Sequence, residues 1–161
     1  MKKTLALVLA MIMMFAFTTV AFAEEPATPI NGENTAIKAE IQVLRDELMG
    51  LRESHKTIHA QAIVKREIIK TLFIAAKEAS LIEKIEAAKA FKEQLKAISA
   101  EIKLIREDKA SLWVQLKAAK SEKDFETVKA NLTQIIALKK QIISKANARL
   151  AVMDDIISTL Q

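Results

Sequence analysis

Apolar residues recur at alternating steps of three and four along most of the chain. The clearest run lies between residues 88 and 119, where one lysine interrupts an otherwise apolar series. Its members are Ala88, Phe91, Leu95, Ile98, Ile102, Ile105, Lys109, Leu112, Leu116 and Ala119. This spacing places the apolar side chains on one helix face, and a sustained seven-residue repeat is typical of helices wound around one another.

Two further stripes of the same kind lie on either side of this run. The earlier one comprises Ile37, Ile41, Leu44, Leu48, Leu51, His55 and Ile58. The later one extends from Val128 to Leu160 and is interrupted by Lys139 and Arg149. Additional apolar residues beside the stripes make them wider than a two-stranded rod needs, which favours a bundle.

The polar stretches between the stripes predict two short turns. Ser80 to Glu83 has the S-x-x-E form of a capping box, and Ser121 to Asp124 is its S-x-x-D counterpart. Asp124 could instead be the N-cap itself. We therefore predict an all-α protein, an elongated antiparallel three-helix bundle or coiled coil. Its expected helices cover residues 35–78, 82–119 and 124–160.

The chain also resembles itself when residues 66–102 are aligned with residues 106–142. The two segments carry the same residue at 11 of 37 positions, about three times what composition alone would give. Charged matches such as Arg66 with Arg106 do not follow from a shared apolar period. The sequence thus predicts an internal repeat of about 40 residues.

Because neither predicted turn holds Gly or Pro, a longer helical hairpin that dimerises is the alternative to a three-helix monomer.

Residues 1–23 have the features of a secretory signal peptide. Lys2 and Lys3 precede a long uncharged run, and small residues stand before a predicted cleavage site between Ala23 and Glu24. We expect the chain to be exported to an extracytoplasmic location: secreted, periplasmic or in the cell envelope. An uncleaved membrane anchor is the alternative, because about 18 apolar residues can just span a bilayer.

Removing the signal peptide divides the remainder into a linker and one domain. Residues 24–34 contain both prolines and are expected to form a flexible linker. Residues 35–161 contain no proline and one glycine, Gly50, and are expected to form the helical coiled-coil domain.

Composition and charge restrict the chemistry. There is no Cys and no Tyr, and only two His are present, so the usual nucleophiles and acid–base groups are nearly missing. We expect no enzyme activity, no catalytic residues and no cofactor. Lys2 and Lys3 are the only charged residues of the signal peptide, so its removal lowers the net charge from +5 to +3. This weak, dispersed charge predicts no nucleic-acid binding.

Two pairs of residues are candidate sites. His55 and His59 lie four apart on one helix face, a spacing that can chelate a metal. The stretch lacks the Glu of H-E-x-x-H and no Cys is available as a third ligand, so we expect no metal site. Trp113 lies beside its stripe, with Phe125 across the second turn. Both are candidate partner contacts, and the alternative is that they close one end of the core.

Long amphipathic helices without catalytic groups indicate a protein that acts by protein–protein interaction. The partner is expected to be a fixed protein or an unfolded client, and the role chaperone-like or envelope-associated. In size, export and helicity the chain is similar to the small exported helical chaperones of the Spy and CpxP type. Their L-T-x-x-Q motif is absent, because Leu132-Thr133 is followed directly by Gln134. Alternative functions are an amphipathic binder of membrane surfaces and a structural spacer.

Overall fold

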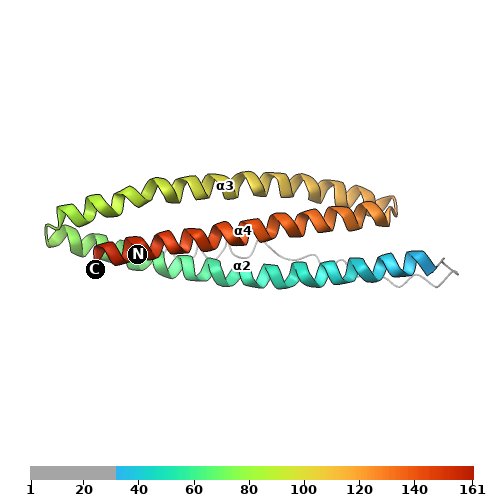
Figure 1. Cartoon of the computed structure of the whole chain (residues 1–161), viewed down its shortest axis with the longest axis horizontal. Helices are drawn as coiled ribbons and strands as arrows, with labels where there is room; N and C mark the ends of the chain where they lie inside the picture. The colour runs from blue at the N-terminus through green and yellow to red at the C-terminus, as the bar shows by residue number, and fades with distance from the viewer. Residues whose placement is uncertain (1–31) are drawn as a thin grey trace, which may run out of the picture. The chain divides into compact units, whose positions relative to one another are not determined.

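The computed structural model describes residues 32–161, which form three long helices joined by two short turns. The helices are α2 (Gly32–Glu78), α3 (Ile82–Ser121) and α4 (Phe125–Leu160). At a rise of 1.5 Å per residue they are about 70, 60 and 54 Å long. α2 and α4 run in one direction and α3 in the other (Figure 1). The all-helical, three-helix prediction is confirmed, with helix bounds that differ by no more than three residues.

The predicted signal peptide, its cleavage site between Ala23 and Glu24, and most of the predicted linker lie outside the described residues. The last three residues of that linker, 32–34, belong to the first turn of α2. None of the helices within residues 32–161 is long and apolar enough to cross a membrane.

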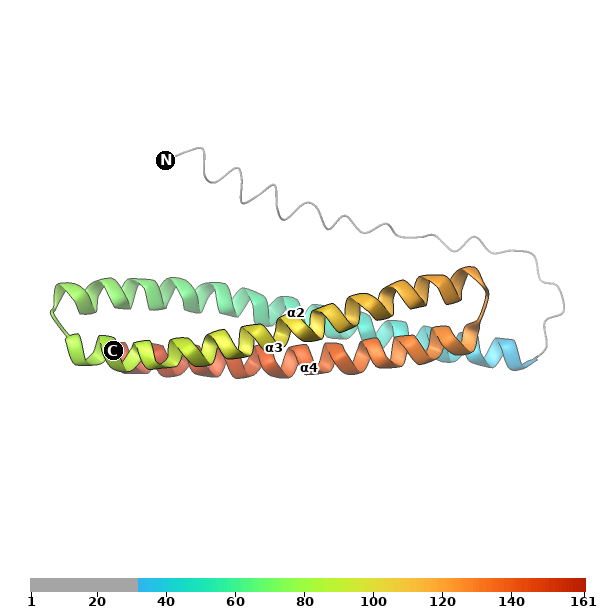
Figure 2. The ribbon, with the colours of Figure 1, turned by 90° about the horizontal axis from the view of Figure 1, so that it is seen from above.

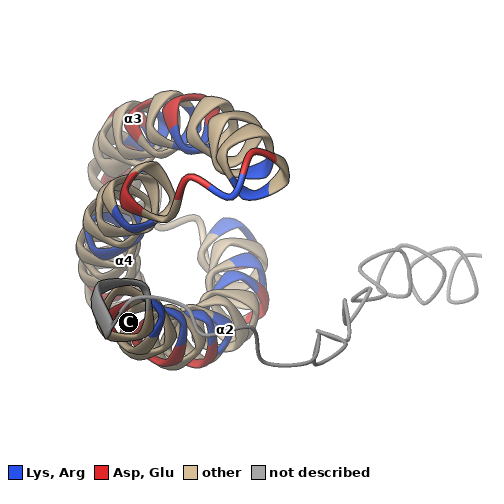
Figure 3. Ribbon diagram, turned by 90° about the vertical axis from the view of Figure 1, so that its right-hand side faces the viewer, with Lys and Arg blue, Asp and Glu red and all other residues tan. Residues whose placement is uncertain are grey.

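α4 is the central helix of the bundle. It packs along its length against both α2 and α3, whereas α2 and α3 contact each other only sparsely. Figure 2 shows the same three helices from above, and the end-on view of Figure 3 shows them on an open curve with α4 between the other two. The apolar stripes therefore meet along two helix pairs, and the third side of the bundle stays open.

The burial pattern of α4 reflects its two neighbours. Ile135 is 0% exposed, and Ile142 and Met153 are nearly as deeply buried. Ile136, Leu150 and Val152, which lie beside the predicted stripe, are buried as well. A helix flanked on both sides needs apolar residues over a wider arc than a single seam provides, which explains why the stripe of α4 is broad.

Both turns are Schellman motifs without glycine. In the first, Leu81 N donates to Ala76 O over 2.9 Å and Ser80 N to Lys77 O over 3.1 Å. In the second, the amides of Asp124 and Lys123 donate to Ala119 O and Lys120 O. Ser80 and Lys123 occupy the position where glycine is usual, with φ of 56° and 58°.

The structure corrects one predicted cap and confirms the other. Ser80 is not the N-cap of α3, because it lies in the left-handed region of the turn, and Leu81 stands at the cap without a side-chain hydrogen bond. Ser121 is still part of α3. Asp124 is the N-cap of α4 and accepts a hydrogen bond of 3.0 Å from Thr127 N. Hydrogen bonding by the side chain and then the backbone of Thr127 lowers the pKa of the Asp124 carboxyl.

Ion pairs join α4 to both neighbours. Lys140 Nζ lies 2.7 Å from Glu47 Oε1 of α2, and Lys145 of α4 pairs with Glu101 of α3. Two further pairs between α2 and α4 are Glu40–Lys129 and Lys65–Asp154. Partly exposed pairs contribute little, about 0–1 kcal/mol each. In three of these four pairs an acidic side chain of α2 or α3 lies next to a lysine of α4, and in Lys65–Asp154 the acidic side chain belongs to α4.

Candidate binding groove

The open side of the bundle contains a groove between α2 and α3, with α4 as its floor. Its cavity volume is about 490 Å³, within the range of about 300–1,000 Å³ that is usual for ligand sites. The apolar part of its lining comes from all three helices: Ile69 and Phe73 of α2, Ile85 and Leu95 of α3, and Met153 and Ile156 of α4. We call this cavity the groove.

The polar part of the lining is entirely basic. Of the twelve described residues that line the groove, five are Lys or Arg and none is Asp or Glu. The cations are Arg66, Lys77, Lys89, Lys92 and Arg149. In the end-on view, Lys and Arg segments lie on the inner sides of α2 and α3, and many Asp and Glu segments lie on their outer sides (Figure 3). Lys89 pairs with Glu86, whose Oε1 lies 2.7 Å from the lysine Nζ. The groove thus combines an apolar surface with an excess of positive charge.

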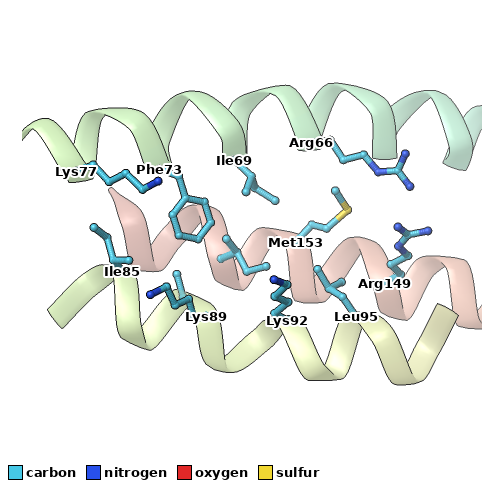
Figure 4. A pocket seen from close by; sticks show the side chains of 12 residues that line it. Arg66, Ile69, Phe73, Lys77, Ile85, Lys89, Lys92, Leu95, Arg149 and Met153 are labelled. Carbon is cyan, nitrogen blue, oxygen red and sulfur yellow. The ribbon is translucent and has the colours of Figure 1, made fainter. Parts of the chain in front are cut away.

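Two guanidinium groups lie together at one end of the groove. Figure 4 shows Arg66 of α2 and Arg149 of α4 with their guanidinium groups turned toward each other. Arg149 is partly buried, and its Nε is a buried nitrogen with no hydrogen-bond partner. Burial, followed by repulsion from Arg66 and Arg106, lowers the pKa of the Arg149 guanidinium. Such a pair can receive a carboxylate or phosphate oxygen in two parallel hydrogen bonds.

A second group of cations lies in the middle of the bundle. His55 of α2, Lys109 of α3 and Lys139 of α4 are polar residues that interrupt the three apolar stripes, and the structure brings them within electrostatic range of one another. We call these three residues the basic layer. Lys139 is only 7% exposed, although it is a lysine.

The charged forms of the three side chains of the basic layer are destabilised. Burial, together with repulsion from Lys109 and Arg106, lowers the pKa of Lys139 to about 8. Burial, with repulsion from Lys139, Arg106 and Lys109, lowers the pKa of His55 to about 4. Burial and the nearby Arg106 also lower the pKa of Lys109. Arg106 of α3 acts electrostatically on both the basic layer and Arg149.

The two histidines and the two aromatic residues that the sequence singled out lie in different parts of the bundle. His55 is half-buried in the basic layer, and His59 is exposed. Within residues 32–161, no three side chains of His, Asp or Glu are arranged to hold a metal ion. Trp113 and Phe125 are half-buried against the core at the far end of the bundle.

A cation lies over each of those two aromatic rings. The Lys38 Nζ is 5.0 Å from the centroid of the Phe125 ring, and the Arg52 guanidinium carbon is 6.0 Å from that of Trp113. This placement fits residues that close the end of the core, and the role of Trp113 and Phe125 as partner contacts stays a prediction.

The sequence marks part of the basic layer and one groove residue but does not reveal the groove. Lys109 and Lys139 of the basic layer and Arg149 of the groove interrupt otherwise apolar stripes, and this interruption is the signal that marks them. Lys77 and Lys92 carry no such signal, because each lies outside its stripe among ordinary surface lysines. They become a site only through the separation of α2 from α3.

Comparison with known proteins gave no match: no family model, no curated protein and no solved structure resembles this chain significantly.

Proposed function

We propose that this chain is an exported, non-enzymatic helical protein that binds a segment of another protein along the open side of its bundle. The observation that carries the proposal is the arrangement of the helices. α4 is covered on two sides, while α2 and α3 leave a groove with an apolar lining between them. An apolar concave surface rimmed by charge is a common feature of interaction sites.

The chemistry of the groove supports binding rather than catalysis. Its titratable groups are lysines and arginines only, so it offers no carboxylate or imidazole to act as a general base. Extracytoplasmic location rests on the signal-peptide features of residues 1–23. The internal repeat and the oligomeric state, monomer or helical dimer, also stay predictions.

Site-specific photo-crosslinking in the native host would test the proposal. A benzoylphenylalanine placed at Lys77 or Lys92 lies in the groove lining, whereas one at Lys140 or Lys145 replaces a lysine that pairs with an acidic residue elsewhere. We expect discrete protein adducts from the two groove positions and none from the two control positions. Equal labelling at all four positions, or labelling of lipid alone from the groove, would contradict the proposal.

A second measurement distinguishes a fixed partner from unfolded clients. The purified chain is mixed at equimolar amounts with reduced insulin, whose B chain aggregates. Suppression of aggregation supports a chaperone-like role. Discrete adducts without suppression support a fixed partner. Binding to anionic vesicles with a gain in helicity, but no protein adduct, would favour the membrane-surface alternative. The spacer alternative requires neither a groove adduct nor vesicle binding.

A further inference from the structure

Resting on the proposed function, we propose that the occupant of the groove is an acidic amphipathic helix of the partner protein, which lies between α2 and α3 as a fourth helix. Its apolar side would contact the groove lining, and its Glu and Asp residues would pair with the surrounding cations.

The charge of the groove selects an acidic occupant. Five cations and no carboxylate are among the described lining residues, and of the five Lys89 is paired with Glu86 beside the groove. Charges of one sign in a low-dielectric concave surface raise the local concentration of opposite charge and exclude partners of like charge. The acidic side chains of α2 and α3 that form ion pairs across helices meet α4 lysines instead, as in Glu47–Lys140 and Glu101–Lys145. A second copy of this basic chain is therefore a poorer match than an acidic partner.

The extent of the charge favours a helix over a single anionic headgroup. Along α2, the cations that line the groove extend from Arg66 to Lys77. These two positions are about 16 Å apart along the helix axis. One lipid headgroup can neutralise only the cations within a few ångströms of it. A helix with an acidic residue every three or four positions offers a negative charge about every 5 Å.

Arg66 and Arg149 provide the most specific binding position for an acidic residue of such a helix. Their guanidinium groups face each other at the end of the groove (Figure 4), and the buried Nε of Arg149 has no hydrogen-bond partner. A partly buried cation next to a like charge is costly to keep unpaired. A Glu or Asp carboxylate placed between the two groups would accept hydrogen bonds from both and remove their mutual repulsion.

The apolar lining would receive the opposite side of the same helix. On α2 the lining extends from Arg66 to Lys77, which is about 16 Å or three helical turns. Leu or Phe side chains spaced by three and four residues would meet Phe73, Met153 and Leu95 over that length. Burial of a few such anchors supplies most of the binding free energy at helix-in-groove interfaces.

Fluorescence anisotropy with synthetic peptides would test the inference. The probe is a labelled amphipathic peptide of about 21 residues, about 30 Å when helical, built from Leu, Ala and Glu. The matched control peptide carries Gln in place of every Glu. We expect the acidic peptide to bind at least about tenfold more tightly than its neutral counterpart and to gain helicity when bound. Binding to phosphatidylglycerol vesicles is measured in parallel, because an anionic lipid headgroup is the alternative occupant of the groove.

Two double variants of the protein separate local recognition from net charge. R66Q/R149Q removes the guanidinium pair, and K140Q/K145Q removes the same number of charges from lysines outside the groove lining. We expect about a tenfold loss of acidic-peptide binding for the first and less than about threefold for the second. Because R66Q/R149Q relieves repulsion, it is expected to fold, which circular dichroism checks.

The outcomes are decisive in both directions. Equal binding of the acidic and neutral peptides, or equal losses in the two double variants, would overturn the inference. So would vesicle binding that R66Q/R149Q abolishes while the acidic peptide does not bind. If groove crosslinking nevertheless captures a protein, the proposed function stands and only the acidic-helix occupant is wrong.

Discussion

At the residue scale, the most unusual positions are side chains that a helical bundle normally avoids. Ser80 and Lys123 hold the left-handed conformation at the two turns. Lys139 lies in the core with an ammonium group that other cations repel. Each of these positions departs from the residue type that gives the greatest stability, so each allows a substitution that is expected to stabilise the protein.

Replacing Ser80 by glycine should stabilise the bundle. An L-residue in the left-handed region costs about 1–2 kcal/mol, which glycine avoids, although glycine also loses more entropy on folding. We therefore expect S80G to raise the free energy of unfolding by about 1 kcal/mol, measured by urea denaturation. The same change at Ser144, within α4, should instead lower it by roughly 0.5 kcal/mol. A loss of stability in S80G would contradict this interpretation of the turn.

Replacing Lys139 by methionine should also stabilise the protein. Methionine keeps most of the side-chain volume and removes a buried charge that Lys109 and Arg106 repel. Apolar replacements of buried charges are often stabilising by about 1–4 kcal/mol, and we expect about 2 kcal/mol for K139M in thermal or urea unfolding. K140M changes the neighbouring lysine, which is exposed and pairs with Glu47, and should reduce stability by less than about 1 kcal/mol. Equal effects of the two changes would show that Lys139 is not electrostatically strained.

At the element scale, the three helices do not contribute equally. α4 contacts both neighbours, so its buried residues hold two interfaces together, whereas α2 and α3 each depend on one. Sequence periodicity predicted the helices closely because a heptad pattern fixes both length and the buried side. It did not predict Leu81 instead of Ser80 at the cap of α3, because Ser80 occupies a left-handed position where glycine is usual, and a serine there does not mark that conformation in the sequence.

Truncation of the central helix should be the most damaging. Ile135 has no exposed surface, and its replacement by alanine leaves a cavity in the α4 core. We expect I135A to reduce the free energy of unfolding by about 2–5 kcal/mol. The control I74A, in α2 with a side chain that is 50% exposed, should cost less than about 1 kcal/mol. Urea unfolding followed by circular dichroism measures both, and similar losses would contradict the central position of α4.

At the scale of the whole molecule, the open side and its charge are the features that sequence could not give. A stripe of apolar residues shows that a helix packs, but not whether three helices close into a triangle or leave one side open. Lys109, Lys139 and Arg149 were visible as interruptions of separate stripes. Their assembly with His55 and Arg106 depends on the register of the three helices, which no single stripe determines.

The basic layer makes the stability of the whole bundle depend on pH. His55 faces Lys139 of α4 and Arg106 and Lys109 of α3, with His59 on its own helix, and its pKa falls from 6.5 to about 4. Between these pH values the unfolded chain binds a proton that the folded chain does not. The free energy of unfolding therefore decreases as the pH falls from about 6.5 to 4.

Comparison with H55L isolates this effect from the titration of carboxylates. After allowance for the partial exposure of His55, we expect the wild type to lose about 1–2 kcal/mol more than H55L over this pH range. H59L changes an exposed histidine and should behave like the wild type. Parallel pH profiles for the wild type and H55L would contradict the prediction.

The pairing of α2 with α4 rather than with its neighbour in sequence has a consequence for how the chain acquires its fold. α3 and α4 can form a hairpin through a short turn, but Lys65 of α2 cannot form its ion pair until Asp154, 89 residues later, has been synthesised. During synthesis from the N-terminus, α2 is complete long before the surface that covers it exists. Its apolar stripe stays uncovered during that time, so nascent α2 is the segment that most needs protection from aggregation while α4 is still being translated.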